Sequence, residues 1–194
     1  MTYNDFEILA KSFGTDKFDH KYLPIYWELF EHKRLEVKRV LEIGVLGGAS
    51  LRLWKQMFPN ADVVGVDTHV INVEGCRVVG CAQERIGSVM PALFDGGEID
   101  LIIDDGCHHS KSQIATFQQA YPYLRVGGYY IVEDIYPSMF GTQFLDFLLH
   151  GFVYPGSKVA RGREFIFFPP PLDIKFFTVH RRMVVIQKGR TDMP

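Results

Sequence analysis

The feature of this sequence that most constrains its fold is a regular alternation of short apolar runs with longer amphipathic segments. Five apolar runs have the length and composition of buried strands: residues 37–45, 62–67, 77–81, 99–104 and 128–133. Two intervening segments, residues 50–58 and 110–124, have helical spacing, and each begins at a serine that can cap a helix. This alternation predicts a parallel sheet with right-handed crossovers and helices on both faces.

The two ends of the chain depart from this alternation. Residues 22–35 carry aromatic side chains at helical spacing and predict a short helical extension before the first strand. Residues 141–152 predict another helix, and residues 155–163 predict a basic loop. Two final apolar runs, 174–180 and 183–188, are separated by two arginines, which predicts an antiparallel hairpin. We therefore expect an α/β domain built on an open, doubly wound, mainly parallel sheet.

The composition argues against several classes of partner. The 194 residues carry 21 Lys and Arg against 23 Asp and Glu, a formal net charge of −2, which favours neither nucleic acid nor an anionic membrane. No apolar run approaches the roughly 18 residues of a membrane-spanning helix, and the first residues lack a secretory signal pattern. Three cysteines without a repeated spacing do not indicate a disulfide framework, and Cys76 and Cys81 are expected to be small buried side chains. We expect a soluble, cytoplasmic protein that acts on a small molecule.

The first candidate site follows the first expected strand, where a glycine-rich turn precedes a helix. Such a turn lets a ligand approach the backbone, and the helix that follows presents free amides. The order of glycines from Gly44, Gly-x-x-Gly-Gly, departs from the dinucleotide pattern and disfavours a nicotinamide cofactor. Asp67 ends the second strand, where a carboxylate binds ribose hydroxyls and repels a 2′-phosphate. The turn and Asp67 together predict a cofactor that contains an unphosphorylated adenosine.

The second candidate site lies at the ends of two further strands. Asp104 and Asp105 close one run, and Glu133 and Asp134 close the next. Neighbouring strands lie about 4.8 Å apart and successive side chains point to opposite faces, so each pair can offer one side chain to a common point. Like charges this close need a cation, and hard oxygen ligands favour Mg²⁺, Mn²⁺ or Ca²⁺ over Zn²⁺. A helix-capping role stays open for some of these carboxylates, and His108, which follows closely, is a candidate general base.

Four short motifs between residues 14 and 134 form a combination that is more specific than any one of them. They are GTDK at residues 14–17 followed by His20 and Tyr22, EIGVLGG at 42–48, IIDDGCHH at 102–109 and GGYYIVED at 127–134. Together they resemble the class I S-adenosylmethionine-dependent methyltransferases, and among these the macrocin- and mycinamicin-type sugar O-methyltransferases. The resemblance implies a Rossmann-like fold in a single domain over residues 1–194. Residues 1–36 would form a cofactor-lid extension, and residues 37–194 would form the core.

The resemblance also implies a reaction and the residues that carry it. It implies methyl transfer from S-adenosyl-L-methionine to a hydroxyl of a sugar or glycosylated natural product, assisted by Mg²⁺ or Mn²⁺. The metal ligands of that family match Asp105, Glu133 and Asp134 here, and its general base matches His108. The family usually has serine where this chain has Cys107. The cofactor contacts would fall on Thr15, Lys17, Tyr22, Glu42, Gly44, Gly47, Ser50, Asp67, Gln83 and Asp104.

Several interpretations stay open for the acceptor site and for the class of protein. Side chains that either line an acceptor site or pack within the fold follow the second acidic pair: Tyr136, Pro137, Met139, Phe140, Phe144 and Phe147. Lys158, Arg161 and Arg163 either meet a nucleotide-sugar diphosphate or belong to a solvated loop. The competing interpretations are a cephalosporin-hydroxylase-like enzyme, a catechol-type O-methyltransferase and a catalytically inactive partner protein. Assembly into a homo-oligomer also stays open.

Overall fold

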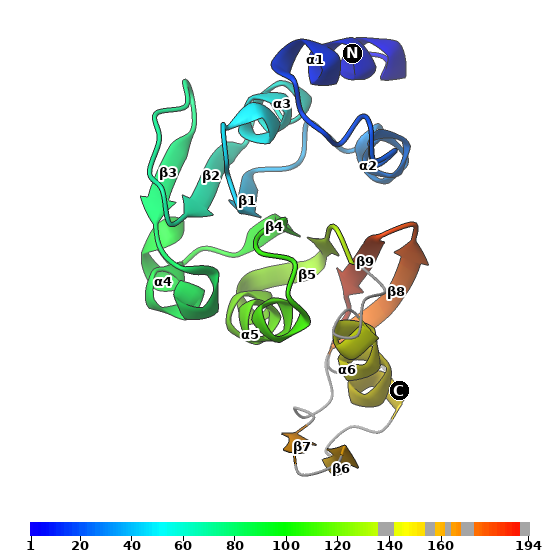
Figure 1. Cartoon of the computed structure of the whole chain (residues 1–194). Helices are drawn as coiled ribbons and strands as arrows, with labels where there is room; N and C mark the ends of the chain where they lie inside the picture. The colour runs from blue at the N-terminus through cyan, green and yellow to red at the C-terminus, as the bar shows by residue number, and fades with distance from the viewer. Residues whose placement is uncertain (136–141, 154–157, 162–163, 168–172, 191–194) are drawn as a thin grey trace.

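The computed structural model describes residues 1–135, 142–153, 158–161, 164–167 and 173–190. Its centre is a seven-stranded sheet with the strand order β3-β2-β1-β4-β5-β9-β8 (Figure 1). The strands are β1 (Arg39–Ile43), β2 (Asp62–Asp67), β3 (Arg77–Gly80), β4 (Ile99–Asp104), β5 (Leu124–Val132), β8 (Ile174–His180) and β9 (Met183–Lys188). Strands β1 to β5 pair in parallel, and β9 runs antiparallel to both β5 and β8. The structure therefore confirms a mainly parallel, doubly wound α/β sheet with a C-terminal antiparallel hairpin.

Helices lie on both sides of this sheet (Figure 1). The helices on one side are α1 (Tyr3–Phe13), α2 (Leu23–Phe30) and α3 (Ala49–Met57). Those on the other side are α4 (Met90–Leu93), α5 (Ser110–Ala120) and α6 (Thr142–Val153). The remaining described elements are two 3₁₀ helices, Gln83–Ser88 and Tyr121–Tyr123, and a separate two-stranded sheet of β6 (Lys158–Arg161) and β7 (Glu164–Phe167). The α2 helix supplies the helical extension that was expected before the first strand, and α1 adds a further helix to it.

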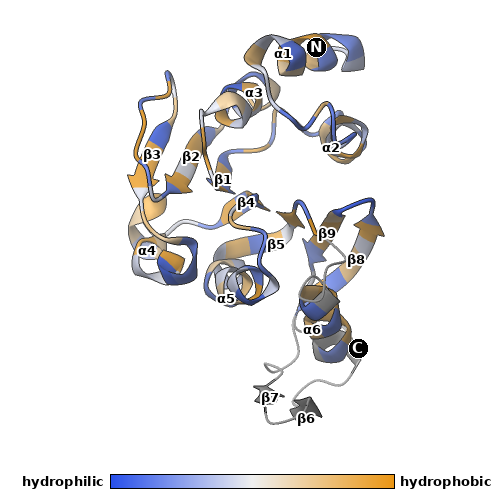
Figure 2. Cartoon of the chain, viewed as in Figure 1, coloured by the Kyte–Doolittle hydropathy of each residue, from blue (hydrophilic) through white to orange (hydrophobic). Residues whose placement is uncertain are grey.

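Two apolar layers, one on each face, hold the helices to the sheet. Leu101 and Ile103 of β4 belong to the layer that contains Trp54 of α3, whereas Ile102 between them belongs to the layer that contains Phe117 of α5. This alternation follows from the two-residue period of a strand. Every residue of β4 is buried, because the strand lies between β1 and β5 and is covered on both faces. Figure 2 shows apolar residues on the strands and on the helices, with hydrophilic residues between them.

Strand boundaries agree with the sequence where an apolar run is short and sharply bounded. The strands expected at residues 62–67, 99–104, 174–180 and 183–188 are confirmed residue for residue. The run expected over 37–45 stops pairing at Ile43, because Gly44 adopts a φ of 90° and turns the chain. The helix expected over 22–35 is confined to Leu23–Phe30, and α1 had no sequence prediction.

Three local predictions are wrong. Gly48, with a φ of 73°, is the N-cap of α3, and Ser50 instead lies inside the first turn, where its hydroxyl donates to Glu42 at 2.6 Å. Helix α5 begins at Ser110 as predicted, but its N-cap is His109 and it ends at Ala120 rather than at residue 124. Part of the expected basic loop, residues 158–161, forms strand β6, which pairs with β7. In α3, the left-handed Gly48 and the hydrogen bond from Ser50 to Glu42 overrode the capping preference of serine.

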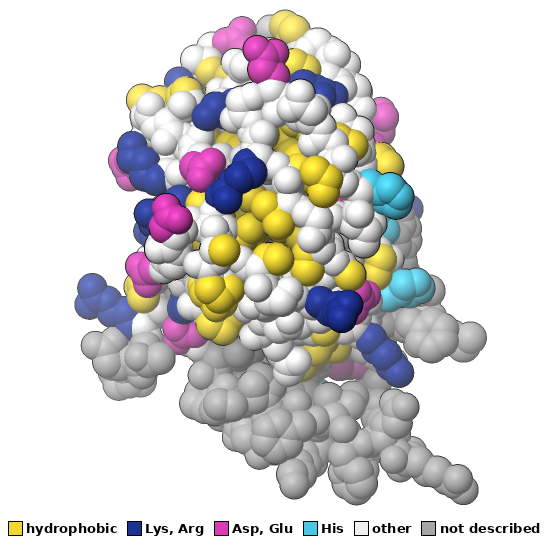
Figure 3. All heavy atoms as spheres, turned by 90° about the vertical axis from the view of Figure 1, so that its left-hand side faces the viewer, with side chains coloured by type: hydrophobic (Ala, Val, Ile, Leu, Met, Phe, Trp, Pro, Cys, Tyr) yellow, Lys and Arg dark blue, Asp and Glu magenta, His cyan; other side chains and the backbone are white. Residues whose placement is uncertain are grey.

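Among the described residues, no helix is both long enough and apolar enough to span a membrane. Figure 3 shows the face on the β3 side, where apolar side chains lie among side chains of both charges. All three cysteines are free thiols, and Cys76 and Cys81 are half-buried rather than fully buried as expected. Cys107 is exposed.

Candidate functional site

A cavity of about 700 Å³ lies at the carboxyl ends of β1, β2 and β4. Ligands bind at this edge in doubly wound sheets, and the volume is typical of cofactor sites. The lining includes Asp105, His108 and Asp134, which belong to the predicted metal and catalytic residues. It also includes six of the predicted cofactor residues: Thr15, Gly44, Gly47, Ser50, Asp67 and Gln83.

The glycine-rich turn after β1 forms one side of this cavity. A Cβ atom on Gly44 would lie 2.0 Å from the carbonyl oxygen of Asp105, so the turn packs directly on the strand end that carries this carboxylate. Asp67 holds the turn in place, because its Oδ2 accepts hydrogen bonds from the backbone N–H of Val45 at 2.7 Å and of the next residue at 3.2 Å. Partial burial raises the pKa of Asp67, but backbone hydrogen bonds, chiefly from His69, outweigh it and lower the pKa.

Gln83 connects the cavity to the buried Asp104. Its Nε2 donates to Oδ1 of Asp104 at 2.9 Å, and its Oε1 accepts from the backbone N–H of Cys107 at 2.8 Å. Burial raises the pKa of the Asp104 carboxyl to about 7. Asp104 therefore orients a residue of the cavity lining without lining the cavity itself.

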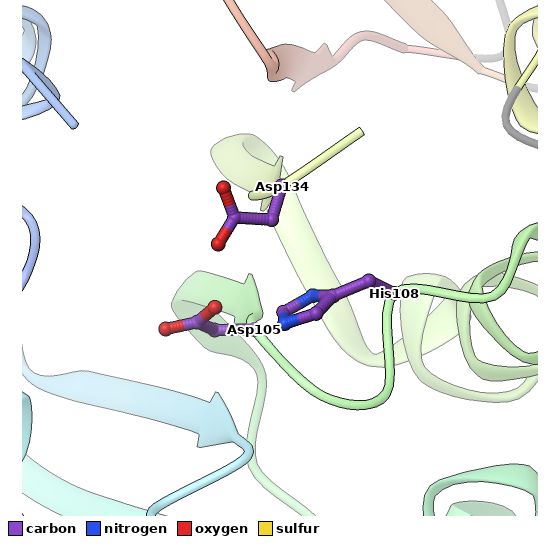
Figure 4. Close-up of side chains that lie close together, drawn as sticks. All are labelled: Asp105, His108 and Asp134. Atoms are coloured by element: carbon purple, nitrogen blue, oxygen red, sulfur yellow. The ribbon is translucent and has the colours of Figure 1, made fainter. Parts of the chain in front are cut away.

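Asp105, His108 and Asp134 all line the cavity, and their side chains lie close together (Figure 4). One ligand atom from each of them lies within 4.8 Å of the other two. His108 and Asp134 adopt left-handed backbone conformations, with φ values of 58° and 52°, a strain that is found at functional sites. The two carboxylates offer the hard oxygen ligands that suit a divalent cation such as Mg²⁺ or Mn²⁺, and the imidazole lies beside them. As the strand period predicts, each acidic pair contributes one side chain to this group.

Glu133 lies outside this group. Its Oε2 accepts from the Nζ of Lys17 at 2.6 Å, and its Oε1 accepts from the hydroxyl of Tyr26. Burial raises the pKa of the Glu133 carboxyl, and the positive charge of Lys17 opposes that shift. The structure therefore brings two of the three predicted metal ligands together with His108 and places the third in an ion pair. A role for Glu133 as a metal ligand stays a prediction.

The predicted residues that do not line the cavity each bond to a predicted site residue. Tyr22 donates to Oδ1 of Asp134 at 2.7 Å. Glu42 accepts from the hydroxyl of Ser50 at 2.6 Å and is fully buried. Lys17 donates to Asp105 at 2.7 Å. The positions thus agree with a role in supporting the site, and direct contact with a cofactor stays a prediction for these residues.

Three contributors to the site were not among the predicted site residues. Tyr26 bonds to Glu133, and the indole Nε1 of Trp54 donates to Glu42 at 3.0 Å. Aromatic residues at helical spacing indicate packing as readily as function, so nothing in the sequence singled these two out. His20 had a signal, because it follows the GTDK motif, and its Nδ1 lies 3.6 Å from Oδ1 of Asp134.

The expected acceptor side is only partly described. Tyr136, Pro137, Met139 and Phe140 lie outside the described residues, as does Arg163. Phe144 and Phe147 are buried in the apolar layer on the α5 side, with ring centroids 5.9 and 6.0 Å from that of Phe117. These two side chains therefore pack within the fold and do not line an acceptor site in this structure.

Comparison with known proteins gives consistent matches. The chain is 31% identical over 142 residues to a tetracenomycin rhamnosyl 3'-O-methyltransferase from Streptomyces olivaceus, which covers 67% of this chain and 36% of that protein. It is 32% identical over 147 residues to mycinamicin VI 2''-O-methyltransferase from Micromonospora griseorubida, with 69% of this chain and 37% of that protein covered. The chain thus spans about a third of the length of these curated relatives. No protein-family model matches the sequence.

A solved structure extends this match over almost the whole chain. The MycE methyltransferase of the mycinamycin biosynthetic pathway, in complex with Mg and SAH (S-adenosylhomocysteine), superimposes with a TM-score of 0.76 at 26% identity. The alignment covers 97% of this chain and 55% of that protein. The chain is therefore homologous to the macrocin- and mycinamicin-type sugar O-methyltransferases and has the class I methyltransferase fold.

Proposed function

We propose that this chain is an S-adenosylmethionine-dependent, divalent-metal-dependent O-methyltransferase that acts on a hydroxyl of a sugar or glycosylated natural product. The observation that carries the proposal is the convergence of Asp105, His108 and Asp134 at the edge of a cavity bounded by the glycine-rich turn. The names of the relatives, which act on sugars of glycosylated natural products, support a sugar acceptor over a catechol. No observation favours the hydroxylase-like or the inactive interpretation.

Each part of the site has a defined role in this proposal. The glycine-rich turn, Asp67 and Gln83 bind the adenosyl part of the methyl donor. Asp105 and Asp134, with Glu133 as the predicted third carboxylate, hold Mg²⁺ or Mn²⁺. A divalent cation bound there would lower the pKa of the acceptor hydroxyl. His108 takes the proton of that hydroxyl as methyl transfer occurs, a task for which imidazole is suited near neutral pH.

The N-terminal segment belongs to this machinery in the proposal. Gly14, Thr15 and Asp16 line the cavity, and the residues that follow bond to the carboxylates beneath it. We infer that residues 1–36 close one side of the cofactor site, whereas residues 37–194 form the core of the same domain. Alignment of the two substrates between these parts would supply much of the rate acceleration.

Calorimetric titration with S-adenosylhomocysteine tests the proposed cofactor. The expected result is a dissociation constant in the micromolar range both with and without Mg²⁺, because the adenosyl site and the carboxylates are separate parts of the cavity. A parallel titration with NAD⁺ is expected to give no heat, since the glycine pattern departs from that of dinucleotide-binding proteins. A chain that binds NAD⁺ but not the adenosyl ligand would contradict the proposal.

Substitution Asp134→Asn is expected to weaken Mn²⁺ binding by about tenfold or more, because it removes one charged ligand of the proposed metal site. Affinity for S-adenosylhomocysteine should change less than threefold. Asp67→Ala is the matched variant. It should weaken S-adenosylhomocysteine binding and leave Mn²⁺ binding nearly unchanged, since Asp67 holds the glycine-rich turn. Both affinities are measurable by calorimetry on the same preparations. Unchanged Mn²⁺ affinity in Asp134→Asn would remove this carboxylate from the metal site.

A further inference from the structure

A lysine from the N-terminal segment is completely buried among the carboxylates at the end of the sheet. The side chain of Lys17 has no solvent exposure. Its Nζ lies 2.7 Å from Asp105, 2.6 Å from Glu133 and 3.6 Å from Glu42. These carboxylates follow or belong to three different strands, β4, β5 and β1. A single ammonium group therefore links the ends of the three central strands of the seven-stranded sheet.

The charge balance of this cluster depends on Lys17. Burying a carboxylate is costly unless an opposite charge or several hydrogen bonds compensate it. Burial raises the pKa of Glu42, and Lys17 opposes that change. Burial disfavours the charged form of Lys17 itself, but Asp105 and Glu133 outweigh this and raise its pKa well above the usual value. Lys17 thus places one positive charge within 3.6 Å of three buried or partly buried carboxylates.

The same segment orients every carboxylate that is predicted to bind a metal. Lys17 donates to Asp105 and Glu133, Tyr26 donates to Glu133, and Tyr22 donates to Asp134. In Asp105 and Asp134 these bonds involve Oδ2 and Oδ1 respectively, so the other oxygen of each carboxylate is not engaged by them. A second cation could therefore bind the oxygens of Asp105 and Asp134 that these bonds do not use.

We propose that Lys17 is the resident counter-cation of this carboxylate cluster and that it competes electrostatically with the divalent cation at Asp105 and Asp134. The inference rests on the proposed metal site. Because Lys17 and the divalent cation share Asp105 as a neighbour, the two positive charges repel each other at short range. Lys17 is therefore a positioning residue that keeps the site folded without a metal and limits how tightly the metal binds.

A series of charge substitutions tests this role, because removing a positive charge and removing a negative charge should change the Mn²⁺ affinity in opposite directions. Lys17→Met removes the competing cation and is expected to tighten Mn²⁺ binding by about tenfold or more at pH 8. Glu42→Gln removes a neighbouring negative charge that is not a predicted metal ligand, and should weaken binding. The double variant restores the net charge of the cluster, so its Mn²⁺ affinity should lie within about threefold of that of the unaltered chain. Lys33→Met is the matched control, because Lys33 bonds to Tyr129 away from the cluster.

Free Mn²⁺ is measured by electron paramagnetic resonance, and thermal unfolding is followed without metal and with saturating Mn²⁺. Lys17→Met should melt lower than the unaltered chain without metal and recover more stability when Mn²⁺ is added. Equal or weaker Mn²⁺ binding by Lys17→Met would overturn the inference. If that variant does not fold, tighter or unchanged binding by Glu42→Gln would overturn it. Absence of Mn²⁺ binding by the unaltered chain would instead contradict the metal dependence in the proposed function.

Discussion

Replacing His108 by alanine is expected to reduce methyl transfer by about 10²- to 10⁴-fold, the usual contribution of a positioned general base. The imidazole lies between two strand ends in a strained backbone conformation, beside Asp105 and Asp134. In the proposed mechanism it takes the proton of the acceptor hydroxyl and is not itself a metal ligand. Binding of S-adenosylhomocysteine and of Mn²⁺ should therefore change less than threefold.

His109→Ala is the matched control for this prediction. His109 is the adjacent imidazole, it is exposed, and it lies at the N-cap of α5 without a side-chain capping bond. Turnover, cofactor affinity and Mn²⁺ affinity are measured for both variants. If His108→Ala loses Mn²⁺ affinity in parallel with turnover, His108 acts as a metal ligand and not as the general base. Normal turnover of the variant would remove it from the mechanism.

Replacing Gly44 by alanine is expected to destabilise the fold by roughly 3 kcal/mol or more. The φ of Gly44 is 90°, which side chains rarely adopt, and the added Cβ would lie 2.0 Å from the carbonyl oxygen of Asp105. The strand end that carries Asp105 would have to move, and the carboxylate would leave the group with His108 and Asp134. For a chain of this size the expected fall in melting temperature is about 6–12 °C. Mn²⁺ affinity should fall as well.

Gly47→Ala separates this steric effect from a general effect of altering the turn. A Cβ on Gly47 would meet no atom within 4 Å, and Gly47 is not in the left-handed region. Its melting temperature should stay within about 2 °C of that of the unaltered chain, since open surface substitutions change stability little. Equal melting temperatures for the two alanine variants, measured by calorimetry or circular dichroism, would mean that the turn can relax away from Asp105.

The sequence determined the elements of the fold with good accuracy where local signals were strong. The runs at 62–67 and 99–104 are short and bounded by polar residues, and their strands agree residue for residue. Its weaker predictions concerned helix ends. Ser50 and Ser110 have the right chemistry for caps, but a left-handed Gly48 is the N-cap of α3, and the hydroxyl of Ser50 bonds to Glu42. Cap choice depends on neighbours that the local pattern does not contain.

The sequence by itself also determined which residue types gather at the functional edge, because motifs at parallel strand ends must meet there. Only the tertiary structure decided which of those side chains contact one another. It turns Asp105 and Asp134 toward His108 and turns Glu133 toward Lys17. The partners of Lys17 at Asp105 and Glu133 are 88 and 116 residues away along the chain. Contacts over such distances depend on strand order, register and the packing of the N-terminal segment, and none of these is encoded in a local spacing of residues.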